Sequence, residues 1–151
     1  MPKQSAGILL YRRANGLLQV FLVHPGGPFF RNKDNGSWSV PKGEYVDGEE
    51  PLTAAKREFE EETGQTLTGN FIKLKPVKQK SGKTVHAWAV EGDIDHEKII
   101  SNVFEIEWPP RSGKKATFPE VDRAGWFTID EARLKIIPAQ VGLIEELEGI
   151  V

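Results

Sequence analysis

The sequence predicts an α/β fold in which a mixed β-sheet lies between helices, and three features support this prediction. Apolar runs of strand length occur in pairs joined by short turns, as in β-hairpins. Segments with helical periodicity stand between and after these pairs. The length of 151 residues is that of one domain with one core. We therefore expect residues 1–151 to form a single domain.

The first two predicted strands span residues 6–13 and 17–24. Both runs are almost continuously apolar, which is typical of strands buried on both faces. Asn15 and Gly16 stand between them, and this dipeptide favours the tight turn of a hairpin. The chain is therefore expected to open with a buried hairpin.

Residues 25–37 collect glycines, prolines and charged residues, which predicts a long exposed loop. Long loops in compact domains are often functional. We expect Phe29 and Phe30, at the centre of this loop, to anchor it to the core. A stacking surface for a nucleobase is the alternative interpretation.

Residues 51–63 are predicted to form the helix around which the chain is organised. Its apolar stripe is formed by residues that recur at steps of three and four: Leu52, Ala55, Phe59 and Thr63. Pro51 suits a first helical turn because that turn has no use for its missing N–H, and Gly64 can adopt the left-handed conformation that ends a helix.

Three carboxylates, those of Glu58, Glu61 and Glu62, fall on a second face of this helix. They repel one another, and they lie near the negative end of the helix dipole. Ion pairs such as Arg57 to Glu61 are one way to balance this charge. However, residues 50–62 contain two basic residues for five acidic ones. A divalent cation such as Mg²⁺, which prefers oxygen ligands, is the other way.

The stretch from Gly43 to Gln65 resembles the signature of the Nudix hydrolases, G-x5-E-x7-R-E-U-x-E-E-x-G-U, in which U is apolar. The matching residues are Gly43, Glu49, Arg57, Glu58, Phe59, Glu61, Glu62 and Gly64. Gln65 departs from the pattern because it stands where the family prefers an aliphatic residue. The resemblance implies an α/β/α sandwich and a phosphoanhydride hydrolase that uses Mg²⁺, with Mn²⁺ as a substitute.

The resemblance also implies roles for the acidic face. Glu61 and Glu62 would be the principal metal ligands, and Glu58 would be a ligand or the general base. Arg57 and Glu49 would orient these carboxylates without binding the metal themselves.

Two further positions are implied from outside the helix. The backbone carbonyl of Lys42 would complete the metal shell, while its side chain could bind a phosphate. An outlying glutamate would return to the metal from far along the chain. Glu120 is our choice for it, with Asp122 and Glu105 as alternatives.

Residues 71–79 and 84–91 are predicted to form a second hairpin. In its second strand His86 and Trp88 lie on the same face, since strand side chains alternate. If this face lines the cleft, Trp88 would stack on a base and His86 would touch a phosphate. A packed indole and a surface histidine are the alternative.

The remaining chain predicts a strand at residues 102–108 and a basic loop at residues 109–119, in which Arg111 and Lys114 would steer a polyphosphate toward the carboxylates. A Trp-Phe strand follows, and a Thr-x-x-Glu capping box at residues 128–131 then starts a helix. Residues 138–147 carry apolar residues at helical spacing and should pack on the sheet.

The pattern W-x-x-P-K-G at residues 38–43 resembles the family branch that cleaves dinucleoside polyphosphates and inositol pyrophosphates. A diadenosine tetraphosphate-like substrate is therefore the first expectation. Hydrolysis of a nucleoside triphosphate, ADP-ribose or capped RNA is the alternative, as is a nucleotide-sensing module without catalysis. The family's isomerase branch is disfavoured because its usual chemistry needs cysteine, which the chain lacks.

The net charge of −2 and a pI near 6.0 give no overall attraction for nucleic acids or anionic membranes. The partner expected is a small nucleotide, with no stable nucleic-acid partner and no membrane. We expect a monomer or homodimer. The absence of cysteine excludes disulfides and thiolate sites. A cytoplasmic location is the expectation.

Overall fold

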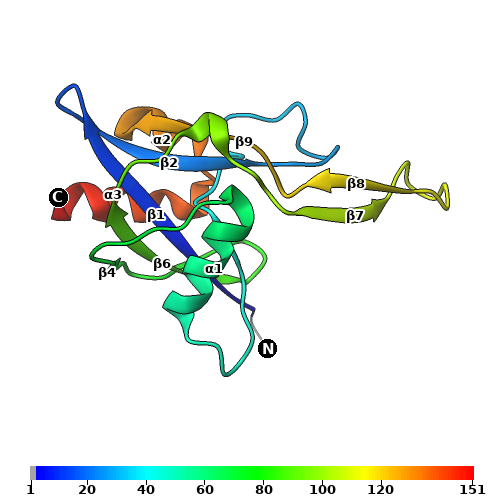
Figure 1. Ribbon diagram of the computed structural model, residues 1–151, viewed down its shortest axis with the longest axis horizontal. Helices are drawn as coiled ribbons and strands as arrows, with labels where there is room; N and C mark the ends of the chain where they lie inside the picture. The colour runs from blue at the N-terminus through cyan, green and yellow to red at the C-terminus, as the bar shows by residue number, and fades with distance from the viewer. Residues whose placement is uncertain (1–2) are drawn as a thin grey trace.

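The computed structural model describes residues 3–151 and contains a mixed sheet between helices (Figure 1). The strands are β1 (Gln4–Ala14), β2 (Leu17–Pro25), β3 (Lys42–Glu44), β4 (Ile72–Lys73), β5 (Val77–Lys78), β6 (Thr84–Glu91), β7 (Val103–Glu107), β8 (Lys115–Pro119) and β9 (Val121–Thr128). The main sheet has the order β4-β6-β1-β2-β9, with β3 paired to β1 and β5 paired to β6. β1 and β6 are parallel, and the other neighbours are antiparallel.

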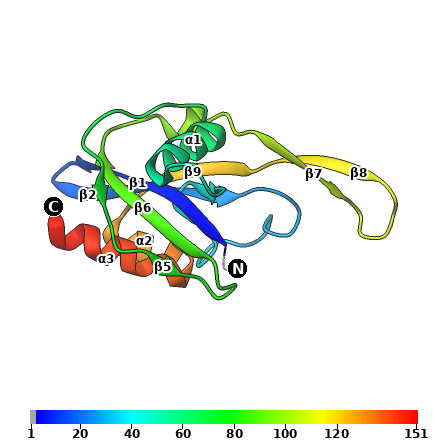
Figure 2. The same ribbon diagram turned by 90° about the horizontal axis from the view of Figure 1, so that it is seen from below.

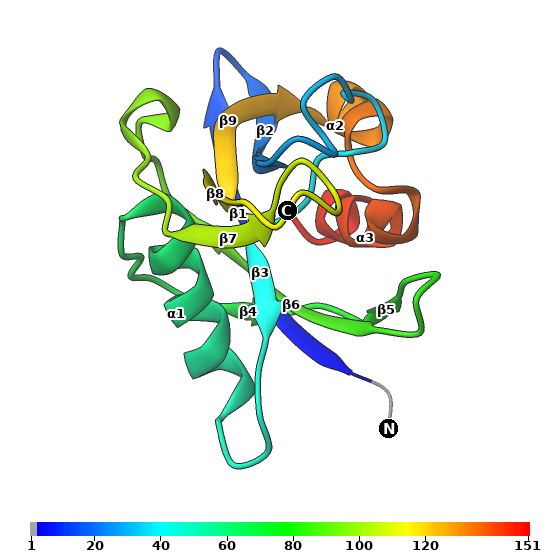
Figure 3. The same cartoon turned by 90° about the vertical axis from the view of Figure 1, so that its right-hand side faces the viewer.

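The helices cover both faces of this sheet, and Figure 3 shows α1 on one side with α2 and α3 on the other. The α-helices are α1 (Pro51–Thr63), α2 (Ile129–Lys135) and α3 (Val141–Ile150), and short 3₁₀ turns span His96–Lys98 and Pro138–Gln140. Alternate residues of the central strands pack into two apolar clusters, one on each side. The predicted α/β/α arrangement is confirmed. No helix within residues 3–151 is long and apolar enough to cross a membrane.

The opening hairpin is confirmed. Asn15 and Gly16 both have positive φ, as a two-residue hairpin turn requires. Residues 8–10 and 20–22 are fully buried because helices cover both faces of β1 and β2.

β1 divides one of its edges between two partners. Its residues 5–7 pair with β3, and its residues 11–14 pair with β2. β2 and β3 therefore diverge from β1, and an isolated bridge joins Val23 of β2 to Ser39, which precedes β3. The segment that leads from Trp38 into α1 thereby begins inside the sheet.

β7 and β8 form a separate two-stranded ribbon that projects from the body of the domain (Figure 2). The strand predicted at residues 102–108 is confirmed. The basic loop predicted at residues 109–119 is partly wrong, because residues 115–119 pair with β7 as β8. The strand predicted at residues 71–79 is likewise present only as two short pieces, β4 and β5, on either side of the buried Leu74.

The three predicted helices are confirmed, and their ends follow the expected chemistry. The Glu50 carboxylate accepts a hydrogen bond from the backbone N–H of Thr53 at the start of α1, and Gly64 is left-handed at its end. Thr128 and Glu131 form the predicted capping box of α2.

Candidate functional site

The acidic face of α1 is partly buried against the rest of the domain. Glu58 and Glu62 are 8% and 6% exposed, whereas the Glu61 side chain is 38% exposed. Phe59 and Ala55, on the neighbouring stripe, pack into the core cluster beneath the helix. Burial of this stripe fixes the rotation of α1, and the carboxylates are therefore held at the edge of the core instead of in bulk water.

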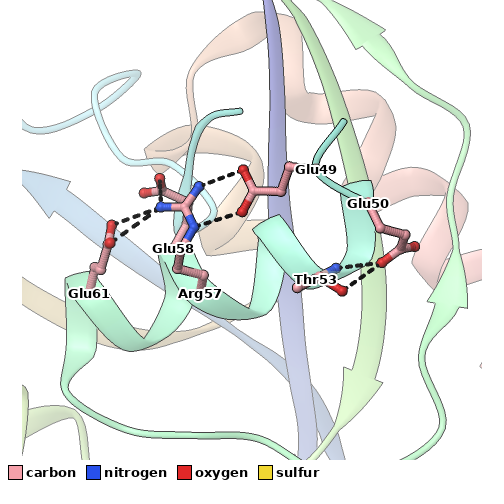
Figure 4. A network of polar contacts seen from close by, with 6 residues as sticks. All are labelled: Glu49, Glu50, Thr53, Arg57, Glu58 and Glu61. Atoms are coloured by element: carbon pink, nitrogen blue, oxygen red, sulfur yellow. Dashed lines mark hydrogen bonds and ion pairs between the residues drawn. The ribbon is translucent and has the colours of Figure 1, made fainter. Parts of the chain in front are cut away.

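Arg57 lies at the centre of the acidic face (Figure 4). Its Nε and Nη2 donate to the two oxygens of Glu49 at 2.9 and 3.0 Å, and its Nη1 donates to Glu58 at 2.9 Å. The same Nη1 lies 3.2 Å from a Glu61 oxygen. The Glu49 carboxylate raises the pKa of Arg57, so the guanidinium stays charged. Arg57 thus holds three carboxylates in fixed orientations.

Gly43 leaves the space that the Glu58 carboxyl group occupies. A Cβ atom at residue 43 would lie 2.1 Å from the carboxyl carbon and from one oxygen of Glu58. Gly43 sits in β3, directly opposite α1, so the strand backbone forms a wall against which the carboxylate rests. Glycine is required here because a side chain would collide with the Glu58 carboxyl group, and not because the backbone has a positive φ.

The carboxylates near α1 resist ionisation. Burial raises the pKa of Glu62 well above its ordinary value, and the charges of Glu58 and Glu120 add to this effect. Burial also raises the pKa of Glu58, with a further contribution from Glu61, while Arg57 opposes it. Burial and then the Glu61 charge raise the pKa of Glu120. Repulsion among these carboxylates thus adds to the effect of burial.

This donor set fits a hard divalent cation, because it offers carboxylate oxygens whose mutual repulsion a cation would remove. Within residues 3–151, no three or more His, Cys, Asp or Glu side chains are close enough together to hold a metal ion as they stand. Glu58 and Glu61 are instead paired with the guanidinium of Arg57.

Glu120 reaches the end of α1 through a short chain of backbone hydrogen bonds. The N–H of Asn102 donates to the carbonyl of Glu61 at 2.8 Å, and the N–H of Glu120 donates to the carbonyl of Asn102 at 2.9 Å. The N–H of Gly26 donates in turn to the carbonyl of Glu120 at 2.9 Å. Residue 120 is thus fixed beside the acidic face although it lies about sixty positions from it in the chain.

The two alternatives to Glu120 lie elsewhere. Asp122 accepts a hydrogen bond from the buried ring of His24. Glu105 lies on the ribbon, more than half exposed, 3.6 Å from Lys115 Nζ. Of the three outlying acids named from the sequence, only Glu120 lines a pocket together with Glu62 of α1.

Lys42 is the first residue of β3 and lines the same pocket as Glu62. Its backbone N–H faces the carboxylate of Glu62. Burial and then the charge of Lys83 lower the pKa of the Lys42 amine, while Glu62 is the first of the acids that oppose this shift. The residue is therefore placed to present both backbone and ammonium to a ligand beside Glu62.

A pocket of about 540 Å³ opens next to these residues. Lys42, Glu62 and Glu120 form its polar end, whereas Phe30 and Phe104 contribute aromatic rings. Residues of the 26–37 loop, the end of β2 and the base of the ribbon supply the other walls. The pocket occupies the region where β2 and β3 diverge from β1.

The other residues expected to bind substrate do not line this pocket. Trp88 is buried in the apolar cluster under α1, and His86 Nε2 is hydrogen-bonded to Gln4 beside Tyr45. Arg111 and Lys114 are exposed at the tip of the ribbon. The structure thus separates them from the acidic face.

The expectation that Phe29 and Phe30 anchor their loop in the core is wrong. Their exposed fractions are 61% and 39%. Phe29 packs edge-on against Trp108 of the ribbon with the ring centroids 5.5 Å apart, while Phe30 lines the pocket. The alternative interpretation, a stacking surface for a nucleobase, stays a prediction.

Several pocket residues were not singled out from the sequence. Phe104 alternates with Glu105 along β7, and Lys33 lies in a charged loop, so neither position carried a distinctive signal. Their shared location depends on how the ribbon folds back beside the loop. A sequence pattern contains no information about that contact.

Comparison with known proteins agrees with this geometry. Residues 1–147 match the family model described as NUDIX domain. A Caenorhabditis elegans Ap4A hydrolase in a binary complex is 20% identical, with 96% of each chain covered and a TM-score of 0.68. The NUDIX domain of Shewanella oneidensis NrtR, complexed with ADP ribose, is 16% identical over 99% of this chain and 88% of that one, with a TM-score of 0.67. The search of curated proteins found no match. At such low identities the solved structures establish the shared fold alone.

Proposed function

The chain belongs to the NUDIX domain family and is a pyrophosphohydrolase of that family, and from this premise we propose that it hydrolyses a phosphoanhydride bond in a nucleoside diphosphate linked to another moiety. The observation that carries the proposal is that Glu62 and Glu120 line one pocket together with Lys42 and the rings of Phe30 and Phe104. Such a pocket offers oxygen ligands for a cation at one end and a surface for a base at the other.

Glu58, Glu61, Glu62 and Glu120 would hold Mg²⁺ or Mn²⁺, together with the backbone carbonyl of Lys42. A bound divalent cation supplies charge neutralisation at the phosphates and acidifies water for attack on phosphorus. The raised pKa values of Glu58 and Glu62 support this assignment. They show that burial and neighbouring charges disfavour the ionised carboxylates, and a bound divalent cation would stabilise that ionised form.

The chain's own residues then perform three tasks. The bidentate pair of Arg57 with Glu49 fixes the guanidinium, which in turn orients the carboxylates of α1. Glu58, buried and raised in pKa, is placed to accept a proton from the attacking water, and Glu120 is the second group that could do so. The Lys42 ammonium, at the polar end of the pocket, meets a phosphate oxygen.

The pocket favours a nucleotide because its polar and aromatic ends are contiguous. Phe30 and Phe104 contribute aromatic surface against which a base can pack, and Lys33 Nζ, 5.5 Å from the Phe30 ring centroid, can meet a phosphate. Residues that choose the leaving group are thus in the loop and the ribbon, whereas α1 supplies the chemistry.

A dinucleoside polyphosphate is the first substrate that we propose. Beyond the pocket, the ribbon continues the aromatic surface from Phe104 to Trp108, against which Phe29 packs. Trp108 directly follows β7 and lies four residues from Phe104, or about 14 Å at the usual rise of a strand. A second base at the far end of a long phosphate chain would stack there, with Arg111 and Lys114 near its phosphates.

The test is to incubate the purified protein and Mg²⁺ with nucleoside triphosphates, dinucleoside polyphosphates, ADP-ribose and capped RNA, and to identify the products by mass spectrometry. We expect the dinucleoside polyphosphate to have the highest kcat/KM. A Trp108→Ala variant should lose this preference while it keeps its rate on mononucleotides. Saturable binding without cleavage of any compound would instead favour a nucleotide sensor.

A further inference from the structure

A completely buried histidine lies behind the pocket wall and takes no part in the chemistry proposed above. His24, near the end of β2, has no exposed surface. Its Nδ1 lies 2.8 Å from an Asp122 carboxylate oxygen on β9, and its Nε2 lies 2.7 Å from the backbone carbonyl oxygen of Lys33. One ring therefore joins β2, β9 and the 26–37 loop.

Both partners of the ring are hydrogen-bond acceptors. A carboxylate and a backbone carbonyl cannot donate, so both bonds exist together only when both ring nitrogens carry hydrogen. A buried cationic ring needs a compensating charge, and the Asp122 carboxylate supplies it. Trp38 packs edge-to-face with this ring, with centroids 5.2 Å apart. Other charged groups nearby are Arg123, whose Nε is 4.0 Å from Asp122, and Asp34, which is hydrogen-bonded to Trp38.

The carbonyl that His24 binds lies in the part of the loop that faces the pocket. The loop is held at its start by the hydrogen bond from Gly26 to Glu120. It is held at its end through Asp34, which accepts from Trp38 Nε1 at 2.8 Å and from Lys135 Nζ at 2.7 Å. Between these ends, the bond from His24 ties down Lys33.

The hydrogen bond between His24 and the Lys33 carbonyl affects the pocket, because Phe30 and Lys33 both line the pocket from this part of the loop. The backbone N–H of Lys33 donates to the carbonyl of Phe30, so the two residues form one turn. A constraint on the Lys33 carbonyl therefore also places the Phe30 ring.

We propose that His24, bridging Asp122 and the Lys33 carbonyl, is a positioning residue that holds the 26–37 loop in its pocket-lining conformation and thereby sets substrate affinity. The effect on affinity rests on the proposed function, whereas the effect on the loop does not. His24 would act on KM and leave the carboxylates of α1 in place.

The first test variant is His24→Phe, which keeps a ring against Trp38 and removes both hydrogen bonds. Trypsin gives a direct readout, since Arg31 and Lys33 are cleavage sites inside the loop. We expect cleavage there to accelerate about ten-fold, which corresponds to the loss of a charge-assisted hydrogen bond. KM should rise by about the same factor, and kcat should change less than two-fold.

Asp122 provides the conservative comparison. In Asp122→Asn the amide can donate to Nδ1 of a neutral ring while Nε2–H still donates to Lys33, so loop cleavage and KM should stay near those of the wild type. In Asp122→Leu the rate of loop cleavage and KM should both rise. This variant replaces His24→Phe in the test if His24→Phe does not fold. Asp93→Asn is the matched control, because it removes a 2.8 Å ion pair to Arg12 away from the pocket.

Nitrogen NMR of labelled histidine adds a signature that a packing role would not produce. The wild-type His24 ring should show two protonated nitrogens, and the Asp122→Asn ring should show one. Unchanged loop cleavage in both His24→Phe and Asp122→Leu would overturn the proposal, as would cleavage that rises equally throughout the chain. If no nucleotide is hydrolysed, the proposed function fails, while proteolysis and NMR still decide the role of His24.

Discussion

Replacing Gly43 by alanine should separate catalysis from stability at this site. The added methyl group would lie 2.1 Å from the carboxyl group of Glu58, whereas ordinary contact begins at 3.4 Å. The carboxyl group must therefore move by about 1.3 Å, the difference between these two distances. Because it is the end of a flexible side chain, it can move without disturbing the strand.

The magnitude follows from this displacement. A misplacement of about 1 Å in a catalytic constellation can cost about 100-fold in rate, or about 2.7 kcal/mol of activation free energy. Stability should change little, because β3 has a backbone conformation that alanine accepts, and alanine restricts the unfolded chain by about 0.4–1 kcal/mol. We expect kcat to fall about 100-fold with the melting temperature almost unchanged.

The assay is product formation from a dinucleoside polyphosphate at saturating Mg²⁺, with thermal melting measured on the same preparations. Gly82→Ala is the matched control: Gly82 has a φ of +88° and no atom within 4 Å of the added carbon. It should lose about 1–2 kcal/mol of stability from the left-handed backbone and keep its activity. A Gly43→Ala enzyme with wild-type kcat, or equal losses of activity in both variants, would refute the reasoning.

Three further predictions concern the charged groups. Glu61→Gln and Glu62→Gln should fold normally, as judged by circular dichroism, and lose most turnover; wild-type rates in both would remove their assignment as ligands. Mg²⁺ at about 100 times its Kd should stabilise the wild type by about 2.7 kcal/mol, and a melt in EDTA against Mg²⁺ should show much less of this gain in Glu62→Gln. Hydrogen bonds from Lys135 and then Trp38 lower the pKa of Asp34, so its stabilisation is present above the ordinary carboxyl pKa and is lost as pH falls through the lowered value. Melting temperatures of wild type and Asp34→Asn should converge in that acid range, and a constant difference between them would contradict the prediction.

The chain's local chemistry determined α1 and the side chains it presents. Pro51, Gly64 and the spacing of the apolar stripe fix the helix ends and its buried face through interactions within a few residues. The same spacing places Glu58 and Glu62 together on the next face, where both are buried at the edge of the core. The opening hairpin followed from the Asn-Gly turn in the same way.

The alternation of β6 shows the limit of such patterns. A period of two places His86 and Trp88 on one face but does not say what covers that face. In the structure α1 covers Trp88, and the pocket opens elsewhere. β8 was missed for a related reason, because residues 115–119 become a strand only through their pairing with β7.

The sequence by itself thus determined the family, the central helix and the carboxylates it carries, since each depends on neighbours three or four residues away. Only the tertiary structure decided that Glu120, and not Asp122, stands beside them, and that Phe30 and Phe104 share a pocket. These contacts join segments distant in the chain. Which of many compatible partners meets a given residue is settled by the packing of the whole domain and not by local preference.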